Sequence, residues 1–199
     1  MGKPIAEAPV APDISIADPA PLGLAAFALT TFLLSLANAH VWPSTTTALA
    51  LAMAYGGGVQ LLAGMWEFKR NNTFGATAFS SYGAFWIGYF IFVMFIAKSV
   101  PSADVGATVG TFLMAFGIFT AYMTVASLRV SVAIVVVFVL LTVTFFLLAI
   151  GAYEASTAWT KVGGWVGVAT AAAAWYASFA GVTNSTFKKV VLPVVPLAR

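Results

Sequence analysis

The sequence predicts an all-α, polytopic membrane protein with six transmembrane helices in each subunit. Of its 199 residues, 61% are hydrophobic and only 8% are charged, and the mean hydropathy is +0.98. A soluble domain has about 45–50% apolar and about 25% charged residues, and a water-soluble globule of this size could not bury so much apolar surface. The composition therefore excludes a soluble enzyme, a nucleic-acid binder and a disordered chain.

Long stretches without Asp, Glu, Lys or Arg locate the helices, and they are 19–66, 71–97, 105–128, 130–153 and 162–187. A spanning helix needs about 20 mostly apolar residues, so each of the last four stretches holds one helix. The first stretch is long enough for two, and Asn38, His40 and Pro43 supply the break between them. The expected spans are 21–39, 46–66, 74–97, 105–128, 131–153 and 158–182.

The basic residues predict the orientation. Six spans place both termini on one side, and that side collects most of the Lys and Arg residues: Lys3, Lys69, Arg70, Arg129, Lys188, Lys189 and Arg199. The other side has only Lys98 and Lys161. Because cytoplasmic loops carry the excess of Lys and Arg, we expect a multi-pass cell-membrane protein with a cytoplasmic N-terminal tail (1–18), a transmembrane transport domain (19–187) and a cytoplasmic C-terminal tail (188–199).

The reactive residues are too few for catalysis. The chain has no Cys and a single histidine, His40, in an expected outer loop. Glu67 and Glu154 stand at helix ends, so no ionisable group is expected at the membrane centre, where it would mark function. Neither a nucleophile–base pair nor a cluster of metal ligands can be assembled. We therefore expect no catalytic residue, no metal site and no cofactor.

Neutral polar residues inside the spans are the candidates for a polar lining: Thr30, Asn38, Gln60 and Ser81. Most Ser and Thr side chains in a helix bond to their own backbone. The amide of Gln60 needs partners in hydrocarbon, so Gln60 is either a link between helices or part of a polar path.

Glycines in three spans allow two interpretations. The run 55–58, Tyr-Gly-Gly-Gly, indicates either close helix packing or exposed backbone beside a path. The pairs Gly106/Gly110 and Gly163/Gly167 have the spacing of close helix contacts. Those contacts lie either within one subunit or between subunits.

The first helix begins with a distinctive motif: Asp18, Pro19, Ala20, Pro21, Leu22 and Gly23. Asp18 can cap the helix, and prolines suit a first turn whose N–H groups have no intrahelical partner. The free N–H groups of such a turn favour small anions. Taken alone, the motif predicts a well-formed helix start.

Several motifs together resemble the acetate uptake transporter family. The helix-1 entry is similar to the family's Asn-Pro-Ala-Pro-Leu-Gly signature, with Asp18 in place of Asn. Residues 55–67 resemble its second-helix pattern and residues 72–86 its third-helix signature, while Leu141-Thr142 and Gly164-Trp165-Val166-Gly167 fit the fifth and sixth helices. The resemblance implies a homo-hexamer with six helices and one narrow acetate path in each subunit. It also implies a hydrophobic constriction formed by Phe27, Tyr82 and Leu141.

Counting along the helices places these residues in one layer. From the cytoplasmic helix starts, Phe27, Tyr82 and Leu141 lie about 9, 12 and 15 Å deep, and Gln60 lies about 10 Å from the cytoplasmic end of its helix. We therefore expect passive or proton-linked permeation of acetate and related short carboxylates, succinate among them. A channel for another small solute such as ammonia is the alternative, and a structural or sensor protein without transport is a third hypothesis.

Overall fold

The computed structural model describes residues 16–197. Lys3, Arg199 and most of the expected N-terminal tail lie outside the described residues. Within the described part, six helical segments are long and apolar enough to cross a membrane. The all-α, six-helix prediction is confirmed.

The first, fourth, fifth and sixth spans are continuous helices: α1 (Ala20–Asn38), α5 (Val105–Ser127), α6 (Val132–Tyr153) and α7 (Thr157–Phe187). The second span is assembled from α2 (Thr46–Ala52), the π-helical η1 (Ala54–Val59) and α3 (Gln60–Lys69). The third consists of α4 (Thr73–Ile91), the π-helical η2 (Phe92–Ile96) and the short 3₁₀ helix η3 (Ala97–Ser99). The spans agree with those expected to within a few residues, and α7 extends furthest beyond its expected end at 182.

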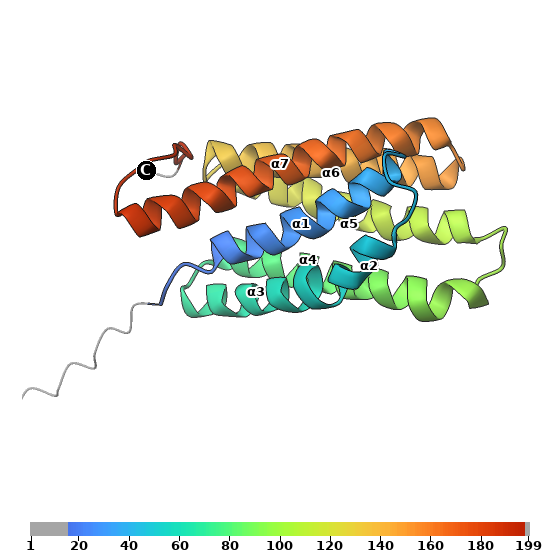
Figure 1. The fold of residues 1–199 in the computed structure, drawn as a ribbon, viewed down its shortest axis with the longest axis horizontal. Helices are drawn as coiled ribbons and strands as arrows, with labels where there is room; N and C mark the ends of the chain where they lie inside the picture. The colour runs from blue at the N-terminus through green and yellow to red at the C-terminus, as the bar shows by residue number, and fades with distance from the viewer. Residues whose placement is uncertain (1–15, 198–199) are drawn as a thin grey trace, which may run out of the picture.

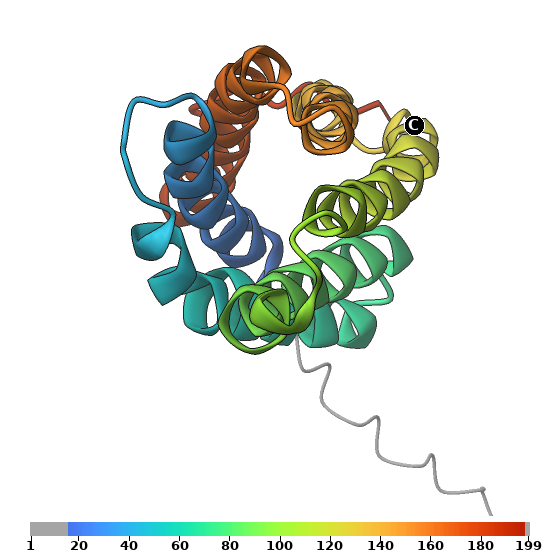
Figure 2. The same cartoon turned by 90° about the vertical axis from the view of Figure 1, so that its right-hand side faces the viewer.

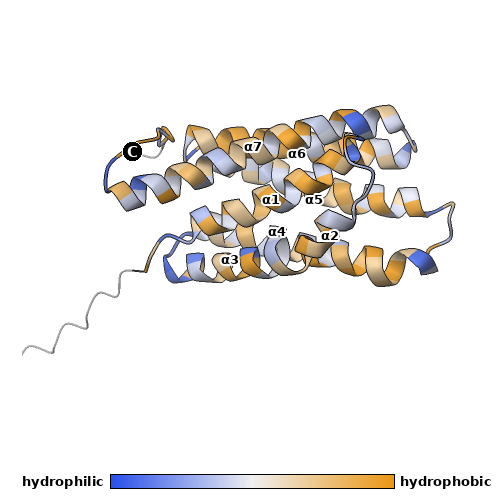
Figure 3. Cartoon of the chain, in the orientation of Figure 1, coloured by the Kyte–Doolittle hydropathy of each residue, from blue (hydrophilic) through white to orange (hydrophobic). Residues whose placement is uncertain are grey.

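Viewed along its long axis, the bundle is a ring of helices (Figure 2). Neighbours around the ring are α1, α7, α6, α5 and α4, and α3 with η1 closes it by packing on both α4 and α1. Apolar residues cover most of the length of the helices, while polar residues gather near the two ends (Figure 3). This distribution suits a bundle whose outer surface faces hydrocarbon.

The two described chain ends lie at the same end of the bundle, here called the terminal end (Figure 1). The turns after α3 and α5 lie there too, which brings together five basic residues: Lys69, Arg70, Arg129, Lys188 and Lys189. The opposite end, here called the far end, holds Lys98 and Lys161.

The glycine pairs pack helices within one chain. A Cβ atom on Gly106 would lie 2.7 Å from the Ala152 carbonyl oxygen, and one on Gly110 would lie 3.0 Å from the Tyr153 ring. Gly163 faces Leu148 on α6 in the same way, with a Cβ separation of 2.8 Å, and Gly167 abuts Ser35 on α1. These contacts support the interpretation as packing inside a subunit.

The C-terminal stretch after α7 turns back along the bundle. The Asn184 side-chain oxygen accepts hydrogen bonds from the backbone N–H groups of Val191 (2.7 Å) and Leu192 (2.9 Å). The Tyr176 hydroxyl donates to the Pro193 carbonyl oxygen at 2.7 Å, and Val132 N–H donates to the Val195 carbonyl at 2.9 Å. The segment expected as a C-terminal tail is therefore packed along α6 and α7 as far as residue 197.

Candidate transport path

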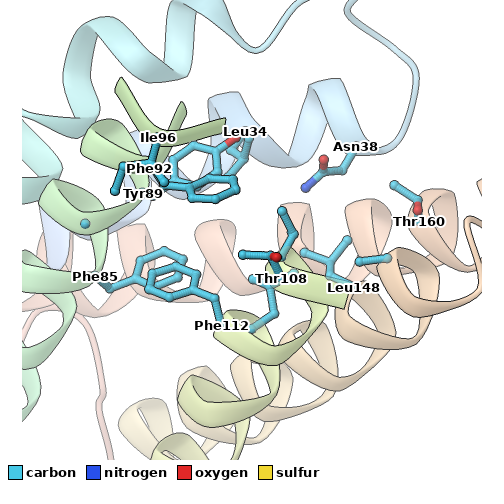
Figure 4. A pocket seen from close by; sticks show the side chains of 14 residues that line it. Leu34, Asn38, Phe85, Tyr89, Phe92, Ile96, Thr108, Phe112, Leu148 and Thr160 are labelled. Carbon is cyan, nitrogen blue, oxygen red and sulfur yellow. The ribbon is translucent and has the colours of Figure 1, made fainter. Parts of the chain in front are cut away.

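A wide vestibule opens at the far end of the ring. Its cavity volume is about 380 Å³, and its walls come from α1, α4, η2, α5, α6 and α7 (Figure 4). Aromatic and aliphatic side chains dominate the walls, and Asn38, Thr108 and Thr160 add polar groups. A mostly apolar cavity with a few placed polar groups is typical of sites for small organic molecules.

Two much smaller cavities continue from the vestibule toward the terminal end. The middle cavity has about 40 Å³ and shares five lining residues with the vestibule: Leu34, Asn38, Phe85, Leu113 and Leu148. The inner cavity has about 20 Å³ and shares Phe27 and Leu141 with the middle one. The shared walls place the three cavities in one row inside a single chain.

Phe27, Tyr82 and Leu141, the residues expected to form a constriction, all line the inner cavity. Their exposed fractions are only 5%, 3% and 3%. The Phe27 and Tyr82 ring centroids are 5.8 Å apart, and Phe138 packs on Tyr82 at 6.1 Å. Side chains from α1, α4 and α6 thus fill the lumen where the row of cavities is narrowest.

A hydrogen bond holds Tyr82 in this position. The Thr120 hydroxyl donates to the Phe116 carbonyl oxygen at 2.7 Å, so its oxygen is free to accept from Tyr82. The two hydroxyl oxygens are 3.0 Å apart, and both residues are buried. Because the Tyr82 hydroxyl is bonded to α5, its ring is held across the lumen.

Gln60 lines the same inner cavity from α3. The residue is fully buried, and neither its amide oxygen nor its amide nitrogen has a hydrogen-bond partner within the described residues. Of the two sequence interpretations, the polar path is therefore the one this arrangement favours. A buried amide with no protein partner is costly unless a solute or water completes it.

The other polar candidates divide between the cavities and the helix contacts. Asn38 lines both outer cavities. Thr30, expected in the lining, instead donates to the Ala26 carbonyl oxygen at 3.0 Å and packs on Gly56, where an added Cβ would lie 2.5 Å from the Thr30 hydroxyl. Ser81 lines none of the three cavities. The glycine run at 56–58 is thus largely a close helix contact.

The entry to α1 lies at the terminal end and is tied to the turn after α3. The N-cap position of α1 is Pro19, and the carboxylate of the preceding Asp18 accepts from the Ala20 N–H at 3.1 Å. It also forms an ion pair with Arg70 at 2.7 Å. The extra negative charge at this position is therefore matched by a neighbouring guanidinium.

Glu67 stands at the end of α3, as expected, but it is fully buried. The Asn72 side-chain N–H donates to one carboxylate oxygen at 2.8 Å, and the other oxygen has no partner within the described residues. Sequence reasoning missed this burial. The small residue Gly75, against which the carboxylate packs, was the one available signal.

Sequence reasoning also missed the aromatic residues that surround the path. Phe85 contacts five neighbouring rings with centroid distances of 4.8 to 6.4 Å, and these belong to Trp86, Tyr89, Phe112, Phe116 and Phe145. The abundance of phenylalanine, 17 residues in the chain, indicates aromatic packing but not which rings meet.

Comparisons with known proteins agree with this arrangement. A family model described as the GPR1/FUN34/yaaH family matches residues 2–199. Acetate permease A of Emericella nidulans is 43% identical over 195 residues, which cover 89% of this chain and 65% of that protein. The chain thus spans just under two thirds of that relative's length.

Two further similarities cover nearly the whole of the related chain. The succinate-acetate/proton symporter SatP of Escherichia coli K12 is 38% identical over 179 residues, which cover 90% of this chain and 95% of SatP. A solved structure of the bacterial acetate channel SatP superposes with a TM-score of 0.86 at 38% identity, covering 90% of this chain and 99% of that one.

Proposed function

The chain belongs to the GPR1/FUN34/yaaH family, and from this premise we propose that it is a membrane channel or transporter for acetate and related short carboxylates, succinate included. The observation that carries the proposal is the row of three cavities through one chain. Each subunit then has its own path. The names of the similar proteins support the choice of acetate as the solute.

Phe27, Tyr82 and Leu141 form the constriction of this path. Their side chains are apolar where they meet, so an ion that loses its water shell there gains little in return. The neutral acid avoids most of that desolvation cost. The Gln60 amide can accept the proton of a carboxylic acid and donate to its carbonyl oxygen, so it suits the neutral acid at the narrowest point.

The terminal end lies on the cytoplasmic side of the cell membrane, so both termini are cytoplasmic. The five described basic residues at this end, against Lys98 and Lys161 at the far end, support that orientation. The assembly is a homo-hexamer, and a path contained within one chain is compatible with an assembly in which each subunit conducts by itself.

Uptake of labelled acetate into liposomes that contain the purified protein tests the proposed function. A carboxylic acid titrates near pH 4–5 in water, by analogy with Glu, so the fraction of neutral acid rises as the pH falls. We expect acetate uptake above that of empty liposomes, and faster uptake when the outside is acidic.

The same preparation tests the alternatives. Robust ammonium uptake without acetate flux or acetate competition would replace acetate by ammonia as the solute. Absence of flux for both solutes in folded protein would favour the structural or sensor hypothesis. Membrane current in planar bilayers and acidification of the liposome lumen separate an anion channel from proton-linked transport. An acetate anion carries charge without a proton, whereas acetate that moves with one proton carries no net charge and acidifies the lumen.

A further inference from the structure

We propose that Thr31 and Trp86 form a hydrogen-bond-donor subsite for the carboxyl group of the permeating acid, in the middle cavity on the vestibule side of the constriction. This proposal rests on the proposed function, and it names two further residues that would bind the solute. It would bind the solute just before the passage between Phe27 and Leu141, which line both the middle and the inner cavity.

Two buried polar groups without partners carry the inference. Thr31 on α1 and Trp86 on α4 both line the middle cavity, and their exposed fractions are 6% and 2%. Neither the Thr31 hydroxyl nor the Trp86 indole N–H has a hydrogen-bond partner within the described residues. Buried polar groups are nearly always paired in folded proteins, so two unpaired groups beside one cavity indicate a missing partner in it.

Another hydroxyl that lines the middle cavity is paired, unlike that of Thr31, and neighbouring rings pack against Trp86. Thr144 lines the same cavity, but its hydroxyl donates to the Leu140 carbonyl oxygen at 2.8 Å and lies 3.1 Å from the Thr170 hydroxyl. The Trp86 ring is packed edge-to-face against Phe85 at 5.1 Å and against Tyr89 at 6.2 Å. These contacts hold the indole in place beside the middle cavity.

The chemistry of the two groups selects an acceptor. An indole N–H can only donate a hydrogen bond, and a threonine hydroxyl can donate as well as accept. A carboxylate or carboxylic acid offers acceptor oxygens to both, whereas an ammonium ion has only donors. No charged side chain lines the middle cavity, so these two donors act on the solute together with the neutral side chains of Ser35 and Asn38.

The size of the cavity fits a small acid. It measures about 40 Å³, and a water-sized probe occupies about 10–15 Å³ on the same measure. The space is therefore that of about three waters, close to the four heavy atoms of acetate. Succinate is twice as long in carbon atoms, so its second carboxyl group must extend into the vestibule.

Two substitutions remove the donors: the first keeps the shape of the side chain, and the second also removes one ring. Thr31→Val replaces a hydroxyl by a methyl group, and Trp86→Phe removes the indole N–H. We expect each to raise the half-saturating acetate concentration in liposome uptake by about tenfold, the upper end of the net value of one neutral hydrogen bond. Thr31→Ser keeps the hydroxyl and should restore the native value.

Matched controls sit next to the proposed donors or carry the same chemical change. Thr30→Val alters the neighbouring threonine, whose hydroxyl is bonded to Ala26 and lines none of the three cavities. Trp159→Phe alters an exposed tryptophan (42% exposed). Both should leave the half-saturating acetate concentration unchanged. Thermal melting of each purified variant separates a loss of affinity from a loss of folding. If Trp86→Phe does not fold, Thr31→Val alone tests the donor subsite.

The uptake measurements distinguish a failure of the proposed subsite from a failure of the proposed transport function. If folded Thr31→Val and Trp86→Phe take up acetate with the native half-saturating concentration, the subsite is wrong and the transport function stands. If the unmodified protein conducts no acetate, the proposed function fails and the subsite fails with it. A raised half-saturating concentration that Thr31→Ser does not restore would assign Thr31 to packing and overturn its role as a donor.

Discussion

The two halves of the lumen are lined by the same kinds of side chain but differ greatly in width. The vestibule measures about 380 Å³, whereas the middle and inner cavities measure about 40 and 20 Å³. Phe85 lines both the vestibule and the middle cavity, and aromatic rings continue into the inner one. Apolar side chains dominate both regions, and the cavity volume is what differs most between them.

The spacing of the helices accounts for the difference. Along its narrow section, α4 is pressed against α3: a Cβ on Gly83 would lie 2.7 Å from the Leu61 backbone nitrogen. One and a half turns later, a Cβ on Gly88 would meet nothing closer than the Phe112 ring at 3.8 Å. After Ile91 the helix continues as the π-helical η2. A π-helix has wider turns than an α-helix. Selectivity should therefore depend on residues of the narrow section and tolerate change in the vestibule.

The largest effect is expected from Tyr82→Ala, which removes a ring from the constriction. Succinate uptake should rise relative to acetate by about tenfold or more, since even one methylene of steric difference in a pocket is worth about 10–200-fold. The ratio of the two uptake rates in liposomes measures this. Tyr122→Ala is the matched control, because Tyr122 is 56% exposed and lines none of the three cavities. A native ratio in folded Tyr82→Ala would end the constriction hypothesis.

The same substitution at two glycines of α4 compares the two regions directly. Gly83→Ala forces α4 away from the α3 backbone and should lower stability by about 1–3 kcal/mol, the usual cost of overpacking. Gly88→Ala has room for the new methyl group and should gain about 0.5–1 kcal/mol from helix propensity. Denaturation of the purified variants by heat gives the sign of each change. Equal stabilities would show that the two regions are packed alike.

Leu141→Ala should widen the narrow section less than Tyr82→Ala, because a smaller volume is removed. We expect a rise of about tenfold at most in the succinate-to-acetate ratio, the lower end of the range for one methylene of exclusion. If Leu141 were ordinary core, truncation would cost about 2–5 kcal/mol, and uptake of both acids would fall together with thermal stability. Leu128→Ala, at an exposed leucine, controls for the substitution itself.

The smallest effect is expected at the terminal mouth, outside both regions. Asp18→Asn breaks the ion pair with Arg70, whose side chains are 52% and 35% exposed, and such pairs are worth about 0–1 kcal/mol. The freed Arg70 should attract acetate, so the half-saturating concentration falls slightly at low salt, and the difference disappears at high salt. Uptake from the terminal side at two ionic strengths checks this, with Asp104→Asn at the far end as control. A difference that persists at high salt would exclude a charge effect.

The sequence by itself determined the number of spans and the depth of the key residues. Hydrocarbon about 30 Å thick needs about 20 apolar residues per helix, so the five stretches free of charge, with the break at 38–43 inside the first, located all six. Counting from the helix starts then placed Phe27, Tyr82, Leu141 and Gln60 at similar depths, and one cavity contains all four. Rise per residue is a local property of the helix, and that is why it could be used without any knowledge of neighbours.

Only the tertiary structure decided which side of each helix faces the lumen. Thr30 and Thr31 are adjacent and identical in type, yet Thr30 packs on Gly56 while Thr31 lines the middle cavity. The burial of Glu67, the unpaired amide of Gln60 and the return of the C-terminal segment onto α6 and α7 likewise depend on contacts between distant residues. In a soluble protein the polar face of a helix marks its outer side. Here both the lipid and the lumen accept apolar side chains, so the pattern along one helix cannot distinguish them.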